Sequence, residues 1–438
     1  MFKRKIETTI NEYLNGKRDK ILIIDGARQI GKTFIIRELA SKLFANYIEI
    51  NLKDDYDDRK DFSKEKTSSI DKFYLRLSSL YGDKLNNKDD TIIFLDEIQV
   101  YPHLISLLKP LNQDGKFTYI CSGSLLGVTL KHTFIPMGSI SEVKMYPLDF
   151  EEFIWANGCG KDVIDYLRDC FKNLKQIDDG THEFLLNRFK EYLLCGGLPA
   201  AVSEFVINKN IMEMRKEHTK IYSYYKDDCS QYDNEHKLKI ARIYEMMPSY
   251  MENKVKRIQA NKISNNKYDT LLKYEDEFDY LVSSGVALSV KAVSNPKFPL
   301  IESSSKNLIK LYYNDVGILT NILYKNNIDA ILSVDKGINL GSVYETAVAM
   351  ELIAHDHPLY YFDSKKVGEV DFLINDYDNL SVLPIEVKSG KNMTNFRAIP
   401  KLVKEPYNLK RGIILSNKRE IKVDGDLITM PIYMVMFI

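Results

Sequence analysis

The first third of the chain alternates short apolar runs with segments in which apolar residues recur every three or four positions. Short apolar runs are typical of buried strands, and the three-to-four spacing is typical of helices. Strands are therefore expected at residues 21–25, 47–52, 91–95 and 117–122, with a helix at 32–44. Strands that alternate with helices predict a doubly wound α/β domain with a parallel sheet. The charged segment 54–66 is expected to be a solvated loop or the start of a helix.

This alternation fades after residue 150, and the pattern stays mostly helical to about residue 288. Residues 271–315 would also fit a helix–turn–helix with a wing. A helix at 343–354 and strands at 359–362, 369–374, 382–387 and 412–415 then predict a small α/β domain. We therefore expect an α/β domain at 1–155, a helical or winged-helix region at 156–305 and a second α/β domain at 306–438.

The composition is that of an ordinary globular protein, with 45% hydrophobic and 28% charged residues. Lys and Arg total 61, as do Asp and Glu, so the net charge favours neither a nucleic-acid nor a membrane partner. The five cysteines form no metal-ligand or disulfide-framework spacing, which fits a reducing compartment. No apolar run reaches about 18 residues. We expect a cytoplasmic protein without a membrane partner.

Residues 26–33 fit the phosphate-binding pattern G-x-x-x-x-G-K-[ST] at every specified position. An apolar strand precedes them and an amphipathic helix follows, as the pattern requires. Lys32 is expected to reach the β- and γ-phosphates of ATP, and the Thr33 hydroxyl to bind Mg²⁺. The backbone of the loop would surround the phosphates, and its residues are Gly26, Ala27, Arg28, Gln29, Ile30 and Gly31.

An acidic pair follows the apolar run at residues 92–95. Asp96 would hold Mg²⁺ at the end of a buried strand, and Glu97 would polarise the attacking water as a general base. ATP hydrolysis is therefore the expected activity. Ser122 and Ser124 close the next predicted strand, where one of them could sense the γ-phosphate. An ordinary strand-ending turn explains these serines equally well.

The chain resembles a group of AAA-like ATPases of bacteria and archaea that carry a C-terminal domain of uncharacterised function. The resemblance rests on residues 26–33, 92–99, 122–126, 145–153, 196–199, 310–319 and 341–388. It implies ATP hydrolysis that drives a mechanical or switching step. Many relatives have a basic residue shortly before the Pro147–Phe150 segment, where this chain has Ser139 within 136–139. The resemblance therefore supplies no finger arginine here.

The last domain carries a second group of polar residues, which resembles the core of PD-(D/E)XK nucleases. Glu386 and Lys388 would share one face of a strand, with Asp371 on the strand before. Asp371 and Glu386 could hold Mg²⁺ while Lys388 orients a water molecule, and Glu345 matches the helix carboxylate of such folds. Residues 382–438 contain 10 Lys and Arg against 5 Asp and Glu, which would suit a phosphate backbone. A degenerate nuclease fold that does not cut would keep the same residues.

Two functions therefore remain open. In the first, ATP hydrolysis is coupled to nucleic-acid binding or processing by the C-terminal domain, with DNA favoured over RNA. In the second, the ATPase is a switch that acts on a protein partner, and the C-terminal domain is a catalytically silent interaction module. Assembly into a homo-oligomer is compatible with both. The cofactors expected are ATP and Mg²⁺.

Overall fold

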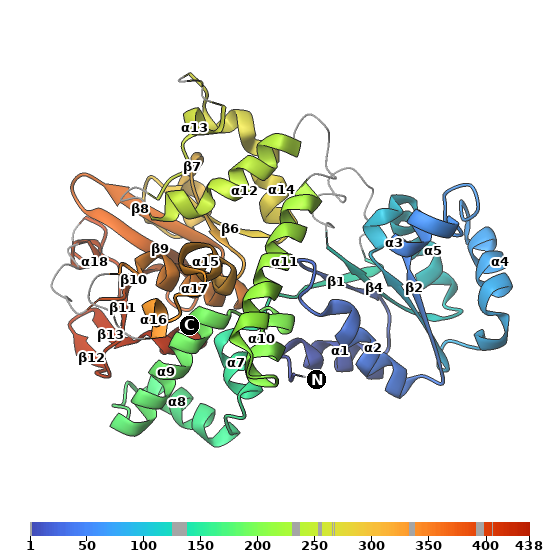
Figure 1. Ribbon diagram of the computed structural model, residues 1–438, viewed down its shortest axis with the longest axis horizontal. Coiled ribbons are helices and arrows are strands. Elements are labelled where there is room, and N and C mark those ends of the chain that lie inside the picture. The colour runs from blue at the N-terminus through green and yellow to red at the C-terminus, as the bar shows by residue number, and fades with distance from the viewer. Residues whose placement is uncertain are drawn as a thin grey trace. The chain divides into compact units, whose positions relative to one another are not determined.

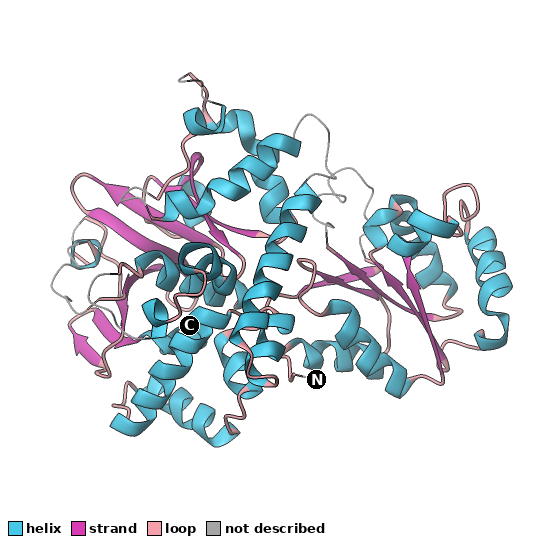
Figure 2. Cartoon of the chain, viewed as in Figure 1, coloured by secondary structure: helices cyan, strands magenta, loops and turns pink. Residues whose placement is uncertain are grey.

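The computed structural model describes residues 2–124, 138–229, 237–252, 256–264, 266, 268–332, 338–390, 398–404 and 406–438 (Figure 1). The chain divides into two compact units. The first comprises residues 3–146 and 283–285, and the second comprises Phe2 and residues 147–282 and 286–438. Each unit contains one of the two sheets drawn in Figure 2. The three predicted domain ranges remain a prediction.

The first unit is built on a five-stranded sheet in the order β2-β3-β4-β1-β5. All neighbouring strands are parallel, and β1, β3 and β4 are buried along their whole length. This confirms the predicted parallel α/β fold. The strands are β1 Ile21–Asp25, β2 Asn46–Asn51, β3 Thr91–Asp96, β4 Thr118–Gly123 and β5 Ile140–Lys144.

The helices of this unit are α1 Ile6–Asn15, α2 Lys32–Leu43, α3 Leu52–Asp54, α4 Ile70–Tyr81 and α5 Pro102–Asp114. Because the strands are parallel, the carboxyl ends of β1, β3 and β4 lie at the same edge of the sheet. This edge therefore gathers the segments that follow these three strands. The phosphate-binding pattern follows β1, and the acidic pair lies at the end of β3.

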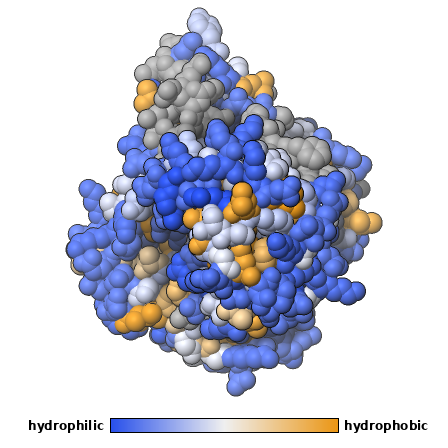
Figure 3. Space-filling model, turned by 90° about the vertical axis from the view of Figure 1, so that its right-hand side faces the viewer, coloured by the Kyte–Doolittle hydropathy of each residue, from blue (hydrophilic) through white to orange (hydrophobic). Residues whose placement is uncertain are grey.

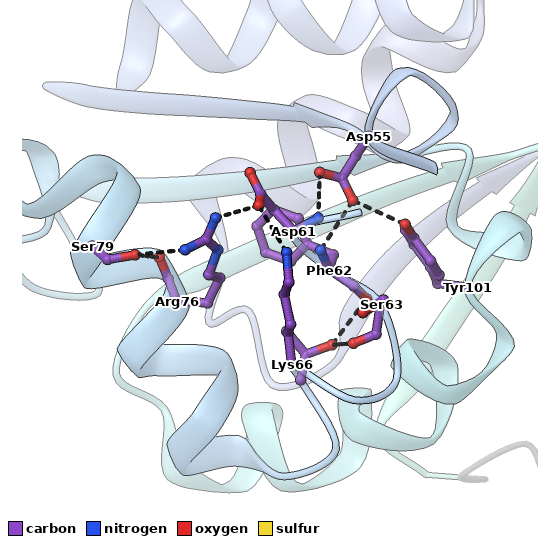
Figure 4. Close-up of polar contacts among 9 residues, drawn as sticks. Asp55, Asp61, Phe62, Ser63, Lys66, Arg76, Ser79 and Tyr101 are labelled. Atoms are coloured by element: carbon purple, nitrogen blue, oxygen red, sulfur yellow. Dashed lines mark hydrogen bonds and ion pairs between the residues drawn. The ribbon is translucent and has the colours of Figure 1, made fainter. Parts of the chain in front are cut away.

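The segment after β2 is folded around two acidic side chains (Figure 4). Asp55 is only 1% exposed, and its carboxylate accepts hydrogen bonds from the backbone nitrogens of Asp61 and Phe62, both at 3.0 Å. The Tyr101 hydroxyl donates to the same carboxylate at 3.0 Å, and Asp61 pairs with Arg76. The predicted start of a helix is found here, since residues 52–59 are helical, and most of the segment 54–66 is exposed. The sequence did not show that Asp55 is buried and pairs with two backbone amides.

The second unit contains an eight-stranded mixed sheet in the order β12-β13-β11-β10-β9-β8-β6-β7. Strands β6 and β7 form an antiparallel hairpin, and β6 also pairs with β8. The hairpin expected as a wing is therefore an edge of this sheet. The strands are β6 Ala287–Val293, β7 Ser304–Tyr313, β8 Leu359–Ser364, β9 Gly368–Asp376, β10 Ser381–Lys388, β11 Gly412–Ser416, β12 Lys422–Asp424 and β13 Leu427–Pro431.

Helices make up most of the rest of the second unit, which confirms the predicted helical middle region and the C-terminal α/β region. The central helix α17 is buried over most of its length, including its polar residues Ser342, Glu345, Thr346 and Glu351. The helices are α7 Phe150–Ala156, α8 Lys161–Asn173, α9 Asp179–Cys195, α10 Pro199–Val206, α11 Ile211–Cys229, α12 Lys237–Met251, α13 Ala260–Ser264, α14 Glu275–Ser283, α15 Val316–Tyr324, α16 Asp329–Leu332, α17 Gly341–Ala354 and α18 Ile399–Leu402.

A buried junction joins the start of α7, the turn between α9 and α10 and the start of α15. The backbone nitrogen of Gly197 donates to Asp315 Oδ2 at 2.7 Å, and its carbonyl accepts from the Leu148 nitrogen at 2.7 Å. The Phe150 nitrogen donates to Glu351 Oε1 on α17 at 2.7 Å. Four of the segments that carry the family resemblance therefore meet here, where their contacts are those of a structural core.

Replacing Gly197 with alanine is expected to lower the free energy of unfolding by about 3 kcal/mol. A Cβ atom at this position would lie 2.0 Å from the Leu148 carbonyl oxygen, in a segment that the backbone hydrogen bond holds in place. Urea unfolding followed by circular dichroism would measure the change. Gly390→Ala is the matched control in the same unit, because a Cβ there meets nothing within 4 Å. Equal unfolding midpoints for the two variants would contradict the prediction.

The surface is largely polar. The face shown in Figure 3 is mostly hydrophilic, and hydrophobic atoms appear on it in separate patches. Among the described residues, no helix is both long enough and apolar enough to cross a bilayer.

Candidate functional site

The loop between β1 and α2 is shaped by two glycines with positive φ. Gly26 has a φ of 152° and Gly31 has a φ of 97°, and residues other than glycine rarely adopt such angles. A Cβ atom on Gly26 would lie 2.2 Å from the Met145 carbonyl oxygen. Gln29 also has a positive φ, of 65°. The loop thus takes the tight course that the phosphate-binding pattern predicts, and it leads directly into the first turn of α2.

The Lys32 ammonium group lies inside this loop. The side chain is 4% exposed, and Nζ donates to the carbonyl oxygens of Gly26 at 2.8 Å and Ala27 at 2.7 Å. Burial lowers the pKa of Lys32, while the carboxylates of Glu97, Asp25 and Asp96 favour its charged form. The loop therefore contains a buried cation, which is what a phosphate group requires.

Thr33 and Asp96 are brought into direct contact from α2 and β3. Thr33 Oγ1 donates to Asp96 Oδ2 at 3.0 Å, and the Ser122 hydroxyl donates to Asp96 Oδ1. Burial raises the pKa of Asp96, and the nearby Glu97 raises it further. A hydroxyl and a carboxylate that share one position are hard oxygen donors of the kind that Mg²⁺ prefers. The donor set therefore fits the predicted metal.

Glu97 follows Asp96 in the left-handed conformation, with a φ of 57°. Its Oε2 accepts hydrogen bonds from Gln99 Nε2 at 2.5 Å and from Ser124 Oγ at 2.8 Å. Burial favours the neutral carboxyl, but Lys32 and the hydrogen bond from Gln99 hold the pKa of Glu97 below its usual value. Glu97 is therefore kept as an oriented carboxylate, as a general base must be.

The structure gives Ser122 and Ser124 different contacts, which the sequence alone could not distinguish. Ser122 contacts Asp96 and accepts from the Glu97 backbone nitrogen at 3.3 Å. Ser124 contacts the Glu97 carboxylate and also accepts from Arg28 Nε at 3.3 Å. Of the residues at 122–126, Ser122, Gly123 and Ser124 are described, and the other two lie outside the described part of the chain.

Two residues at this site were not predicted from the sequence. Gln99 contacts both Glu97 and Ser124, and only its place two residues after Glu97 could have indicated this. Asp25 ends β1, is 5% exposed and has no hydrogen-bond partner for Oδ1. Burial and the charge of Glu142 raise the pKa of Asp25 to about 6. The sequence could have indicated Asp25, because it is an acidic residue that ends an apolar strand directly before the loop.

The second group of predicted residues lies on α17, β9 and β10 of the other unit. Asp371 Oδ2 accepts from the Val387 backbone nitrogen at 2.8 Å, and Glu386 Oε1 accepts from Lys388 Nζ at 2.6 Å. Glu345 Oε2 accepts from the Tyr312 hydroxyl at 3.0 Å. Its other oxygen pairs with Lys256, a residue that the sequence did not single out.

These carboxylates influence one another. Burial and the charges of Glu386 and Glu345 raise the pKa of Asp371 well above its usual range. Burial also raises the pKa of Glu386, although Lys388 opposes this. Glu386 Oε2 is buried without a hydrogen-bond partner. The chain thus brings all four predicted residues together. In the part of the chain that the structure describes, no group of three or more His, Cys, Asp or Glu residues is arranged to hold a metal ion.

The decisive comparison concerns the first unit. Residues 18–154 match the family model of an AAA domain. This range contains the phosphate-binding loop, the acidic pair and both serines, so the chain contains an AAA-like ATPase domain with a nucleotide-binding P-loop. Residues 186–329 and 340–434 match two further models, each described as a domain of unknown function. No curated protein matches the chain.

Solved structures with a related arrangement were also found. The Walker-type ATPase PABY2304 of Pyrococcus abyssi shares 15% identity, with a TM-score of 0.45, over 73% of this chain and 95% of that one. The ORC1 protein of Aeropyrum pernix, solved in complex with DNA, shares 14% identity, with a TM-score of 0.28, over 75% and 92%. The RuvB Holliday junction branch migration motor of Thermotoga maritima shares 12% identity, with a TM-score of 0.28, over 65% and 89%. The identification of the AAA domain rests on the family model.

The buried Asp25 of the AAA domain predicts a pH dependence of stability. Its pKa in the folded chain, about 6, lies above its ordinary value of 3.8, so the folded state binds the extra proton between these two pH values. This contribution to stability is present below about pH 4 and is lost as the pH rises through about 6. Asp25→Asn cannot ionise and escapes this loss, which is up to roughly 3 kcal/mol. Urea unfolding at several pH values would measure it.

The Asp25→Asn variant is a mild change, because Oδ1 makes no hydrogen bond that an amide would break. Relative to wild type, it should become more stable as the pH rises from about 4 to about 7. A stability difference that does not change with pH would contradict the raised pKa.

Proposed function

We propose that the chain hydrolyses ATP with Mg²⁺ and couples this to nucleic-acid binding or processing by its C-terminal region. The observation that carries the hydrolysis is the arrangement around Asp96. Thr33 contacts this carboxylate at 3.0 Å, and the oriented carboxylate of Glu97 comes next in the chain. The groups that would bind Mg²⁺ and the carboxylate that would act as the general base thus lie at the same edge of the sheet, as phosphoryl transfer to water requires.

Each residue has a separate task in this mechanism. Lys32 and the backbone nitrogens of residues 26–33 bind the β- and γ-phosphates. Thr33 and Asp96 would hold Mg²⁺, which would neutralise charge on the phosphate oxygens. Glu97 accepts a hydrogen bond from the attacking water and draws its proton away. Ser124 and Gln99 fix the orientation of the Glu97 carboxylate through their hydrogen bonds.

The C-terminal residues support the coupled function. Asp371 and Glu386 would be the protein ligands of a second Mg²⁺, with the buried, unpartnered Glu386 Oε2 offering one oxygen. Among the described residues no three such side chains are arranged to hold a metal ion, so water molecules would have to supply the remaining ligands. Lys388 would orient the water that attacks the phosphodiester, and Glu345 would add negative charge nearby. The basic excess in residues 382–438 would attract a phosphate backbone.

A specific observation favours the alternative of a silent interaction domain. Lys388 pairs with Glu386 at 2.6 Å, and Lys256 pairs with Glu345. These two ammonium groups already neutralise part of the acidic cluster, which weakens its attraction for a divalent cation. In that case the ATPase is a switch that acts on a protein partner, and assembly into a homo-oligomer fits this function equally well.

The test is Mg²⁺-dependent release of phosphate from ATP, measured with and without DNA or RNA. Turnover that rises with nucleic acid would support the coupled function, and a stronger response to DNA would support the preference for DNA. Turnover indifferent to both would favour the protein partner. Absence of turnover under every condition would overturn the hydrolysis itself.

Cleavage of labelled DNA in Mg²⁺ is expected to be lost in Asp371→Asn and in Lys388→Ala. Asp371→Asn keeps an oxygen for the Val387 nitrogen, so the fold should be preserved while a metal ligand is lost. Asp424→Asn is the control, because Asp424 is an exposed residue on β12. Cleavage that persists in both variants would remove the site from the mechanism, and a wild type that does not cut would favour the silent domain.

A further inference from the structure

A hollow of about 650 Å³ in the second unit is lined by residues of α11 and of the C-terminal end of α15. Four basic residues line it: Arg215, Lys216 and Lys220 from α11, and Lys325, which follows α15. None of the residues that line the hollow is acidic. Such a concentration of one sign of charge in a concave surface raises the local potential for an anion.

Arg215 forms the buried part of this wall. Its side chain is 3% exposed, and Nη1 donates to the Leu194 carbonyl oxygen at 3.2 Å and to Thr320 Oγ1 at 3.1 Å. Its Nε and Nη2 are buried and have no hydrogen-bond partner. Burial lowers the pKa of Arg215 to about 10, although Asp315 opposes this. Because Nε and Nη2 have almost no accessible surface, Arg215 adds positive charge beneath the hollow and makes no direct contact with a ligand in it.

The lysines add charge that is not cancelled inside the hollow. Lys216 pairs with Glu213 at 2.6 Å and Lys220 approaches Glu217 at 3.6 Å, but neither glutamate lines the hollow. Both contacts are exposed pairs within one helix, which contribute little and can be exchanged. Lys325 is exposed, and among the described residues it makes no ion pair.

We propose that this hollow binds the phosphate group of a compact, nucleotide-sized ligand. Its volume lies in the range of small-molecule sites, roughly 300–1,000 Å³. The four basic residues line one concavity, which favours a small ligand over a polymer. Thr219, Ser223 and Asn321 add hydroxyl and amide groups to the same walls. The site is separate from the P-loop and does not depend on ATP hydrolysis.

The experiment measures which lysines a phosphate protects from acetylation, by mass spectrometry of the full chain. The probes are inorganic phosphate and ribose 5-phosphate, without nucleotide, and protection of Lys32 in the same spectra reports binding at the P-loop separately. Protection of Lys216, Lys220 and Lys325 is expected, because a bound phosphate would contact their ammonium groups. Ribose 5-phosphate should protect at lower concentration than inorganic phosphate if the ligand is larger than the anion itself.

A double variant tests the same site by affinity. Lys220→Gln with Lys325→Gln should weaken ribose 5-phosphate binding at least tenfold in calorimetry, since two charges that face the anion are lost. Both side chains are solvent-accessible, so the fold should be unaffected. Lys172→Gln, which replaces an exposed lysine of α8, is the matched control.

Equal affinity in the wild type and the double variant would overturn the proposal. Failure of either small phosphate to protect the three lysines would do the same. Protection by a single-stranded oligonucleotide alone, with none by ribose 5-phosphate, would also overturn it, because the ligand would then be a polymer. None of these outcomes touches the ATPase, whose activity is read separately.

Discussion

Lys32→Ala is expected to abolish ATP binding and to reduce hydrolysis by at least about 100-fold. Lys32 is the buried cation of the loop, and its ammonium group is placed to stabilise the negative charge that develops on the γ-phosphate. Alanine would also leave the Gly26 and Ala27 carbonyl oxygens without their donor. Binding of a fluorescent ATP analogue and release of phosphate would measure both effects.

The matched control for this variant is Lys42→Ala. Lys42 lies on the same helix, is exposed and pairs only weakly with Glu38 at 3.3 Å. It should bind and hydrolyse ATP like the wild type. If Lys32→Ala retained turnover while remaining folded, the phosphates would have to bind elsewhere.

Glu97→Gln is expected to keep ATP binding and to lower kcat by about 10²- to 10⁴-fold. Glutamine has nearly the same shape and can keep a hydrogen bond to Ser124 or Gln99, so the site should stay assembled. It cannot accept a proton from the attacking water. The variant should therefore hold ATP without turning it over, as measured by nucleotide retention and by single-turnover hydrolysis.

Glu38→Gln is the control for replacing a glutamate with a glutamine, since Glu38 is an exposed residue of α2 that pairs with Lys42. Its turnover should match the wild type. Intact hydrolysis in Glu97→Gln would show that another group activates the water, and Asp96 would be the next residue to test.

The first unit could be predicted closely from its sequence, and the reason is local. Strand β1 was predicted at its observed bounds and β3 within one residue, because continuous apolar runs end at polar residues there. The phosphate-binding loop has few alternatives once its glycines are fixed. The segment after β2 is mostly exposed and begins as a helix, as predicted, but nothing in its run of charges shows that Asp55 turns inward to bind backbone amides.

The second unit was harder to predict because its contacts join residues far apart in the chain. Lys256 pairs with Glu345 across 89 positions, and Gly197 donates to Asp315 across 118. The periodicity of apolar residues does not predict polar contacts between residues so far apart in the chain. The resemblance indicated that residues 147–150, 196–199 and 310–319 matter, but only the structure shows that they meet at one buried junction.

The hydrogen bonds of Lys32 also bear on how fast the AAA domain can capture its nucleotide. The ammonium group is anchored by two carbonyl oxygens of its own loop, so its side chain is already confined. When a triphosphate binds, its oxygens would replace the two carbonyl oxygens as hydrogen-bond acceptors of Lys32 Nζ. The backbone of the loop would need little further ordering. Such preorganisation keeps the entropic cost of association small. We therefore expect nucleotide association to be limited by diffusional encounter and not by a prior ordering of the loop.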